Sequence, residues 1–494
     1  MLRCGCVAIL LGALSTVAIA ADFPASLEQR LTAARAELTA ADAQKPAQPA
    51  AQAAAVERLF DLLDEGGQLE TDEARQLVDR DLELRHVDAP NGSSDYALAL
   101  DRQARLQSAH SKLEDVEAIS RRALAMLQQR KPEDAVAEAF SRVTLGLVLL
   151  QRIKLDEAVP LLQTAIAAFD AHHVINVRLV YALRGQALAL ALGRKYDFAQ
   201  AVTDRAIALA TQLTGADSAV VGEVMMSGSY TQRMRGDVAG SIATLDRALP
   251  RLRDAKPPRQ GTYTNALVAL GQTLQQIGDC RRAEQVFGQG LALEKPHPSR
   301  GGIVLPALLN GTASCLRQDG RFADAAAYHE QAVAQFLKLY GPDSAYTTSA
   351  QQSLATDYAA LHRYDDAVAL LKQVRQVAER APASQKAFYA DVALQFGMLD
   401  LWQGRYAAAE SKFRAYLAQF GDYTQFGLGD PRDAMAGLAV SLWAQGHDRQ
   451  AFAEAAAIER SHLQFVRTAG ADLSEHNTID MQDKIRGGRE WMLA

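Results

Sequence analysis

Two stretches of the chain, Gly-Arg-Phe-Ala-Asp-Ala at residues 320–325 and Gly-Arg-Tyr-Ala-Ala-Ala at residues 404–409, are copies of one pattern. With looser copies included, its first position recurs every 42 residues, at Gly236, Gly278, Gly320, His362, Gly404 and Gly446. A small residue precedes each of these positions by seven: Ser229, Gly271, Ala313, Ala355, Gly397 and Ala439. Another follows each by five: Ser241, Ala283, Ala325, Ala367, Ala409 and Ala451. Small side chains at fixed spacing let helices approach closely, so the pattern predicts repeated helix pairs with a turn at the glycine.

Apolar residues between these columns recur at three- and four-residue spacing, as in Leu354, Tyr358 and Leu361, which is helical periodicity. A pair of helices cannot bury its apolar face alone, so neighbouring pairs must stack. The sequence therefore predicts an all-α solenoid. We assign residues 96–465 to it, with eight repeats from about residue 137 and a degenerate ninth before them.

The order of small residue, turn glycine, tyrosine or phenylalanine, and alanine resembles the tetratricopeptide repeat (TPR). That family usually has a period of about 34 residues, and the longer period here resembles the repeats of kinesin light chains. Their inter-repeat link is matched by residues 339–344, Leu-Tyr-Gly-Pro-Asp-Ser, and 213–218, Leu-Thr-Gly-Ala-Asp-Ser, three periods apart. The resemblance implies a right-handed superhelical αα-solenoid whose inner face binds a protein or peptide.

The N-terminus has the features of a secretory signal peptide over residues 1–20. Arg3 precedes an apolar stretch from Val7 to Ala20, and Ala18-Ile19-Ala20 offers a cleavage site. Cys4 and Cys6 precede the apolar stretch, which argues against a lipoprotein. We expect a periplasmic or secreted protein with no membrane span after signal removal; the alternative is an uncleaved anchor.

The two ends of the chain fall outside the 42-residue period. Residues 21–95 predict a loosely attached helical region with a flexible Ala/Pro/Gln-rich linker at 41–55. The tail, 466–494, is similar to the connector that joins TPR arrays to CHAT-type caspase-like protease domains. This similarity implies an alternative role as the non-catalytic sensor or partner half of a CHAT-type protease system.

The formal net charge of −6 becomes −7 when the single arginine of residues 1–20 is removed, and the charges are well mixed. Nucleic-acid binding needs a basic surface, so we expect no nucleic-acid partner. The sequence has none of the common catalytic, metal-binding or nucleotide-binding motifs. We therefore expect no catalytic residues, no metal and no cofactor.

A candidate groove on the inner face consists of polar residues in the first helices. They occupy positions that are not expected to pack into the core. They are Glu223, Tyr230, Arg233, Asn265, Gln272, Gln275, Asn310, Arg317 and Gln352. Amides both donate and accept hydrogen bonds, so a row of them can pair with an extended peptide backbone, and arginine can pair with a carboxylate. The alternative is a solvated polar face without a ligand.

Two further features remain open at the level of sequence. Cys280 and Cys315 lie in segments expected to pack side by side, so they could form a disulfide or remain two buried thiols. The last repeats carry an apolar inner face that marks a contact site or is covered by the tail: Leu394, Met398, Leu401, Trp402, Val440 and Trp443.

These observations together favour an exported scaffold that binds a protein or extended peptide in its concave groove and has no catalysis of its own. Besides the CHAT-type alternative, a structural subunit of an envelope assembly is a third hypothesis, because an apolar end face could pack against copies of itself. The sequence predicts no particular oligomeric state.

Overall fold

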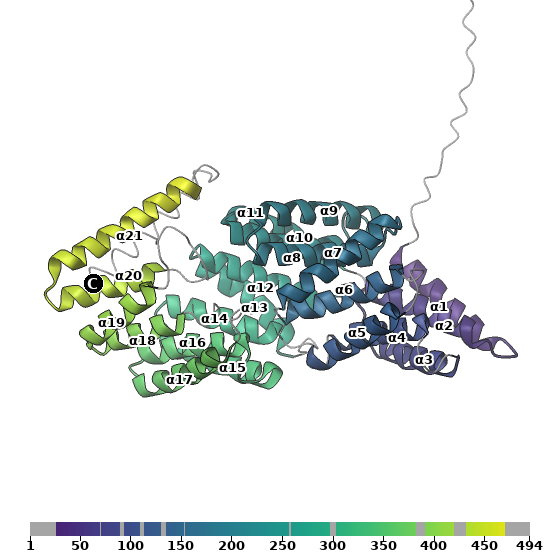
Figure 1. Ribbon diagram of the computed structural model, residues 1–494, viewed down its shortest axis with the longest axis horizontal. Coiled ribbons are helices and arrows are strands. Elements are labelled where there is room, and N and C mark those ends of the chain that lie inside the picture. The colour runs from purple at the N-terminus through teal and green to yellow at the C-terminus, as the bar shows by residue number, and fades with distance from the viewer. Residues whose placement is uncertain are drawn as a thin grey trace, which may run out of the picture.

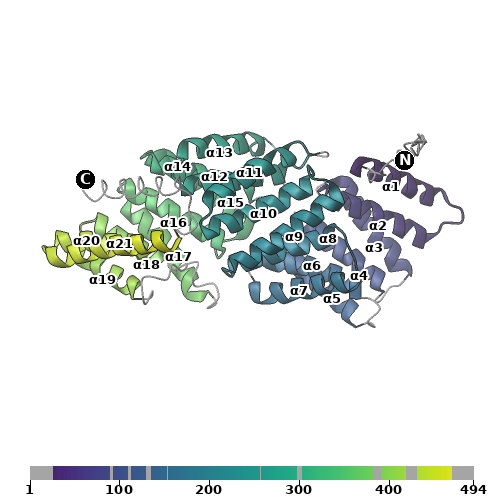
Figure 2. The same ribbon diagram turned by 90° about the horizontal axis from the view of Figure 1, so that it is seen from above.

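The computed structural model describes residues 26–469 apart from 70, 89–92, 109–112, 130–134, 153, 256–257, 297–302, 382–390 and 419–430. The described residues form helices and no strand, and the helices stack along one elongated body (Figures 1 and 2). They are α1 (Leu27–Ala43), α2 (Pro49–Glu65), α3 (Asp72–Asp88), α4 (Ser94–Gln107), α5 (Leu113–Gln128), α6 (Ala135–Gln151), α7 (Leu155–Ala171), α8 (Val177–Leu192), α9 (Tyr196–Thr214), α10 (Ala219–Arg235), α11 (Val238–Arg253), α12 (Gln260–Gln276), α13 (Cys280–Glu294), α14 (Val304–Gln318), α15 (Phe322–Tyr340), α16 (Ala345–Ala360), α17 (Tyr364–Arg380), α18 (Asp391–Trp402), α19 (Tyr406–Leu417), α20 (Pro431–Ala444) and α21 (Asp448–Ala469).

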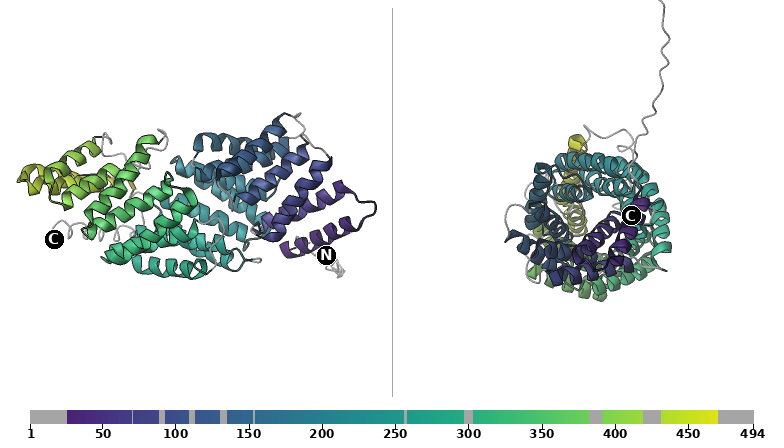
Figure 3. Two further views of the ribbon diagram at one scale, coloured as in Figure 1. Left: turned by 90° about the horizontal axis from the view of Figure 1, so that it is seen from below. Right: turned by 90° about the vertical axis from the view of Figure 1, so that its right-hand side faces the viewer.

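From α4 onward the helices pack as antiparallel pairs, α4 with α5 through α20 with α21. The first helix of each pair contacts its own partner and also the first helix of the next pair. Viewed along the long axis, the pairs follow a ring (Figure 3, right). The predicted all-α solenoid is confirmed.

The turn inside each pair has a left-handed backbone conformation at the predicted period. The φ angle is 96° at Gly236, 79° at Gly278, 75° at Gly320, 71° at Gly404 and 79° at Gly446. His362 and Arg194 occupy the same position in their pairs, with φ angles of 59° and 61°. Glycine has no Cβ to oppose this conformation, which ends the first helix and reverses the chain.

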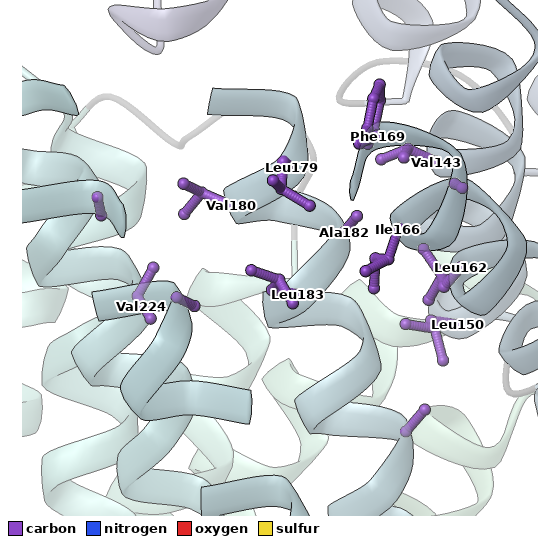
Figure 4. Close-up of a cluster of buried hydrophobic side chains, with 14 of the residues drawn as sticks. Val143, Leu150, Leu162, Ile166, Phe169, Leu179, Val180, Ala182, Leu183 and Val224 are labelled. Carbon is purple, nitrogen blue, oxygen red and sulfur yellow. The ribbon is translucent and has the colours of Figure 1, made fainter. Parts of the chain in front are cut away.

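The core forms where the small residues before and after each turn let apolar side chains of neighbouring helices pack closely together. In one cluster, Leu162 of α7 lies between α6 and α8, and Leu183 of α8 faces Val224 of α10 (Figure 4). The small residues five positions after each turn are buried, and five of them are fully buried: Ser241, Ala283, Ala325, Ala367 and Ala409. Continuous burial from one pair to the next holds the solenoid together.

Residues 41–55 differ from the flexible linker we expected. Only residues 44–48 lie outside helices, because α1 continues to Ala43 and α2 begins at Pro49. Alanine has the highest helix propensity, and proline is tolerated at the first helical position because its missing N–H has no partner there in any case. The stretch is therefore the junction of a helical hairpin.

The N-terminal region is also firmly attached rather than loosely attached. The carboxyl end of α2 contacts the solenoid through Arg259, whose Nε donates to the Gly66 carbonyl at 2.9 Å and whose side chain also bonds the Glu65 carbonyl and the Glu223 carboxylate. Arg105 of α4 pairs with Asp61 at 2.8 Å and with Asp64. These arginines are at least nine-tenths buried. The N-terminal helices, purple in Figure 3, therefore stack on α4 at one end of the body, and the carboxyl end of α2 is bonded to Arg259.

The predicted signal peptide at 1–20 and residues 470–494 of the tail lie outside the described residues. Within the described part, no helix is both long and apolar enough to cross a membrane.

Candidate functional site

A cavity of about 320 Å³ opens between the first helices of three successive pairs and the start of a fourth. Five of the predicted groove residues line it: Tyr230 and Arg233 from α10, Asn265 and Gln272 from α12, and Asn310 from α14. Helix periodicity explains the spacing, since residues three or seven positions apart lie on one face of a helix. The structure therefore brings more than half of the predicted row together in one site.

Arg233 and Tyr230 form the charged wall of the cavity. The Arg233 guanidinium carbon lies 5.3 Å from the centre of the Tyr230 ring, a cation–π distance. Within the described chain Arg233 forms no ion pair, and it is the single charged side chain among the described residues that line the cavity. Burial lowers the pKa of Arg233 and raises the pKa of the Tyr230 phenol.

The three amide side chains in the cavity are available for hydrogen bonding. Asn265 is exposed, and Gln272 and Asn310 are half-buried. None of the three amide groups bonds to another residue that the structure describes, whereas the nearby Gln275 does. An amide with no internal partner can donate to and accept from a ligand backbone.

Two aromatic side chains that the sequence did not predict also line the cavity. Phe336 of α15 and Tyr346 of α16 stack with their ring centroids 5.9 Å apart and their planes at 12°. Tyr340 adds a third ring, 5.3 Å from that of Tyr346. Tyr346 stands just after the Leu-Tyr-Gly-Pro-Asp-Ser link, so that motif was the available signal.

Three predicted groove residues are not among those lining the cavity. Gln275 Nε2 donates to the Gly311 carbonyl at 2.7 Å and to Cys315 Sγ at 3.2 Å. Arg317 lies 3.5 Å from the carboxylate of the buried Asp357, which also pairs with His329. Gln352 is buried, and its Nε2 has no partner among the described residues. Gln275 and Arg317 thus join successive first helices.

Glu223, the remaining candidate, belongs to the contact with the N-terminal region. It pairs with Arg259 and lies 2.9 Å from Arg184. Both of its partners are cations of the chain itself, so Glu223 is not available to a ligand in the way that Arg233 is.

Cys280 and Cys315 are buried and unbridged in the structure. Cys280 Sγ donates to Gln318 Oε1 at 2.8 Å. Burial raises the pKa of both thiols, that of Cys315 to about 12. Because the thiolate is the reactive form, these values disfavour oxidation after folding. A Cys280–Cys315 disulfide stays a prediction.

The apolar surface predicted for the last repeats is partly core and partly exposed. Leu394 and Leu401 are buried in a cluster that Met398 and Val440 border. Trp402 and Trp443 remain 37% and 68% exposed. The residues of the tail after 469 lie outside the described part, so whether they cover these tryptophans stays a prediction.

The described residues hold no cluster of three His, Cys, Asp or Glu side chains suited to a metal ion. What they do present at the cavity is one cation, several unpaired amides and an aromatic surface. This combination is suited to binding by charge, hydrogen bonds and apolar contact.

Comparison with known proteins agrees with this architecture. Residues 305–380, which cover α14 to α17, match the family described as Tetratricopeptide repeat. No curated protein matches the sequence.

Two solved structures of similar fold cover most of the chain, and a third solved structure covers less than half of it. A Rap protein complexed with Competence and Sporulation Factor is 13% identical, covering 72% of this chain and 99% of its own, with a TM-score of 0.51. The apo form of the quorum sensor NprR from B. thuringiensis is 10% identical, covering 74% and 98%, with a TM-score of 0.53. A putative kinesin light chain from Podosopora anserina with nearly identical TPR-like repeats is 19% identical, covering 41% and 96%, with a TM-score of 0.33.

Proposed function

We propose that this chain, which is a tetratricopeptide repeat protein, is an exported scaffold that binds a partner protein or an extended peptide in the cavity between α10 and α16, without catalysis of its own. One observation carries the proposal: Asn265, Gln272 and Asn310 converge on the cavity and bond to no other described residue. Unpaired polar groups in a concave site lose part of their hydration, and a ligand backbone would restore their hydrogen bonds.

Two neighbours of similar fold give context for the proposal. One of them, the Rap protein, was solved in complex with Competence and Sporulation Factor, and another, NprR, is a quorum sensor. At such low sequence identity these examples establish the fold alone. Binding by this chain is therefore proposed from its own cavity.

Export is proposed from the N-terminal sequence. An apolar stretch of signal-peptide length after Arg3 predicts cleavage after Ala20 and a periplasmic or secreted mature chain. Cell fractionation and N-terminal sequencing of the chain from its native host test this. A product that begins at Ala21 supports export, and an uncleaved product in the cytosolic fraction argues against it.

Partner capture tests the binding site. The variant Asn265→Ala with Asn310→Ala removes two unpaired amides, and the matched control Gln212→Ala with Gln331→Ala removes two exposed amides from second helices. Two lost hydrogen bonds of about 1 kcal/mol each predict a fall in partner affinity of roughly thirtyfold. Unchanged capture by the Asn265/Asn310 variant, with helicity retained, would remove the cavity from the proposal.

A structural subunit remains a second candidate because of the exposed Trp402 and Trp443. Large exposed aromatic side chains are enriched at interfaces. Light scattering of the purified mature chain decides this: stable multimers that Trp443→Ser dissolves would favour the assembly role, and a monomer at micromolar concentration would exclude it.

A further inference from the structure

An imidazole and a carboxylate meet in the core of the solenoid, outside the cavity described above. His329 of α15 and Asp357 of α16 are both fully buried, and His329 Nδ1 bonds to Asp357 Oδ2. The other carboxylate oxygen lies 3.5 Å from Nη1 of Arg317 on α14, which also donates to the Ser353 carbonyl at 3.4 Å. Polar groups therefore join three consecutive helices at this point.

The equivalent positions of the neighbouring pairs carry uncharged side chains. At the position of His329, the second helices α9, α11, α13, α17 and α19 have Thr203, Leu245, Phe287, Leu371 and Phe413. At the position of Asp357, the first helices α10, α12, α14, α18 and α20 have Thr231, Thr273, Cys315, Leu399 and Ser441. All of these residues are buried. Leu371 and Leu399 belong to one apolar cluster, so one pair later the fold places two leucines where His329 and Asp357 stand.

The contact between His329 and Asp357 leaves two buried polar atoms unsatisfied. Nε2 of His329 and Oδ1 of Asp357 have no hydrogen-bond partner among the described residues. Such atoms destabilise the closed structure, whereas water would bond to them if the helices separated. Apolar side chains in place of a buried ion pair often stabilise a protein. Separation of α15 and α16 should therefore require less free energy here than at a contact between leucines.

The apolar core is also divided within α16. Ala350 and Leu354 belong to a cluster that extends back to α11, whereas Ala355 and Ala359 belong to another cluster, with α17 and α18. Contiguous apolar burial defines the parts of a protein that open or move as units. The boundary between two such parts therefore lies in the helix that carries Asp357.

We infer that the His329–Asp357 contact is a hinge, about which α16 and the following pairs move relative to α14 and the preceding pairs. Ala350 lines the cavity and stands seven residues before Asp357, about two helical turns away on the same side of α16. Movement at the hinge would therefore change the distance between Asn310 of α14 and Tyr346 of α16, which also line the cavity. The hinge goes beyond the proposed function, and its test needs no partner.

Distances between spin labels on the purified protein test the hinge. Labels at Gln285→Cys on α13 and Ala369→Cys on α17 lie on the two sides of it. Labels at Ala201→Cys on α9 and Gln285→Cys are the matched control, because Ala201, Gln285 and Ala369 are exposed and occupy one repeat position at intervals of two pairs. We expect the distance distribution of the first label pair to be about twofold broader than that of the control pair. Unlabelled parent protein reports any labelling of the buried Cys280 and Cys315.

His329→Leu with Asp357→Leu should lock the hinge, because it copies the contact between Leu371 and Leu399. Arg317 keeps its bond to the Ser353 carbonyl, and its side chain is 27% exposed. We expect the distribution of the first label pair to narrow to that of the control pair, and hydrogen exchange in α16 to slow about tenfold. Arg321→Gln with Asp324→Asn, which removes an exposed ion pair at the start of α15, should leave both measurements unchanged.

Equal widths for the two label pairs in the unmodified protein would overturn the inference, and this comparison requires no change in the core. A distribution between positions 285 and 369 that stays broad in the double leucine variant would also overturn it, because the movement would then have another origin. Loss of partner capture by the Asn265/Asn310 variant bears on the proposed function alone.

Discussion

A Cβ atom placed on Gly271 of α12 would lie 2.3 Å from the ring of Phe287 on α13. The same ring would lie 2.4 Å from a Cβ on Gly311 of α14, so one phenylalanine fills the space left by glycines on both adjacent first helices. Three periods later, Phe413 lies between Gly397 and Gly437 in the same way. This contact is how the small columns join one helix pair to the next.

The packing predicts that Gly271→Ala destabilises the solenoid although alanine favours helix. The methyl group would displace a fully buried ring, and overpacking of this kind costs about 1–3 kcal/mol. The matched control is Gly288→Ala on α13, where no atom lies within 4 Å of the new Cβ, and there we expect a gain of roughly 0.5–1 kcal/mol. Urea unfolding monitored by circular dichroism measures both. Equal effects of the two substitutions would refute the close-packing account.

The turn position predicts opposite effects for two substitutions. Gly320→Ala places a Cβ at a φ angle of 75° and should cost about 1 kcal/mol, although space is open around it. His362→Gly relieves the same conformation at a φ angle of 59°, offset by the greater flexibility of glycine in the unfolded chain, so we expect a gain of about 0.5 kcal/mol. Thermal unfolding midpoints should shift in opposite directions. Shifts of the same sign would contradict the role assigned to this position.

Because Arg259 binds the carboxyl end of α2, we expect Arg259→Gln to release α2 from the solenoid. The substitution removes bonds to the Glu65 and Gly66 carbonyls and leaves Glu223 without its closest cation, a loss of about 3 kcal/mol for a buried pair. Arg30→Gln is the control, since that side chain is 40% exposed and pairs with Glu65 at the surface. Hydrogen exchange in α2 should accelerate in the first variant alone. Unchanged protection of α2 in Arg259→Gln would show that the contact does not hold the region in place.

The Glu117 carboxyl of α5 should make the stability of the folded state depend on pH. Burial opposes its ionisation, but hydrogen bonds from Lys154, Arg121 and Arg152 outweigh burial and lower the pKa of this carboxyl below its ordinary value of 4.5. A carboxylate with a lowered pKa stabilises the folded state above about pH 4.5, and this contribution is lost as pH falls through the folded pKa.

Glu117→Gln should therefore be less stable than the unmodified protein at pH 7, and the difference should shrink as pH is lowered from about 5 to 3. Thermal unfolding across this range measures the difference. A difference that stays constant with pH would exclude the ionised carboxylate as its origin.

The sequence predicted features that depend on residues close together in the chain, and it did not predict contacts between residues far apart in the chain. The glycine period and the small columns are local signals, and they predicted the helix pairs and their turns. The contact of Arg259 with Gly66 joins residues 193 positions apart, and no periodic pattern in the sequence predicts it. The Ala/Pro/Gln-rich composition of residues 41–55 suggested a flexible linker because composition alone did not distinguish one from an alanine-rich helical hairpin.

The candidate site was predicted in part for the same reason. Tyr230, Arg233, Asn265, Gln272 and Asn310 lie on helix faces that periodicity identifies. Gln275 and Arg317 share the repeat position of Arg233 but bond to the next helix, which depends on what that helix presents. Phe336 and Tyr346 reach the site from α15 and the start of α16, and the spacing within one repeat does not predict which residues of later helices line a cavity.

Site-specific photocross-linking shows directly whether the cavity between α10 and α16 receives the partner. A photoreactive amino acid at Ser349, an exposed residue of the cavity lining, is compared with one at Gln331 on the second helix α15, in the cell fraction that holds the mature chain. We expect a discrete cross-linked partner from position 349, reduced at least tenfold by Asn265→Ala with Asn310→Ala, and none from position 331. The same partner cross-linked at position 331 and absent at position 349 would show that the partner does not bind in this cavity.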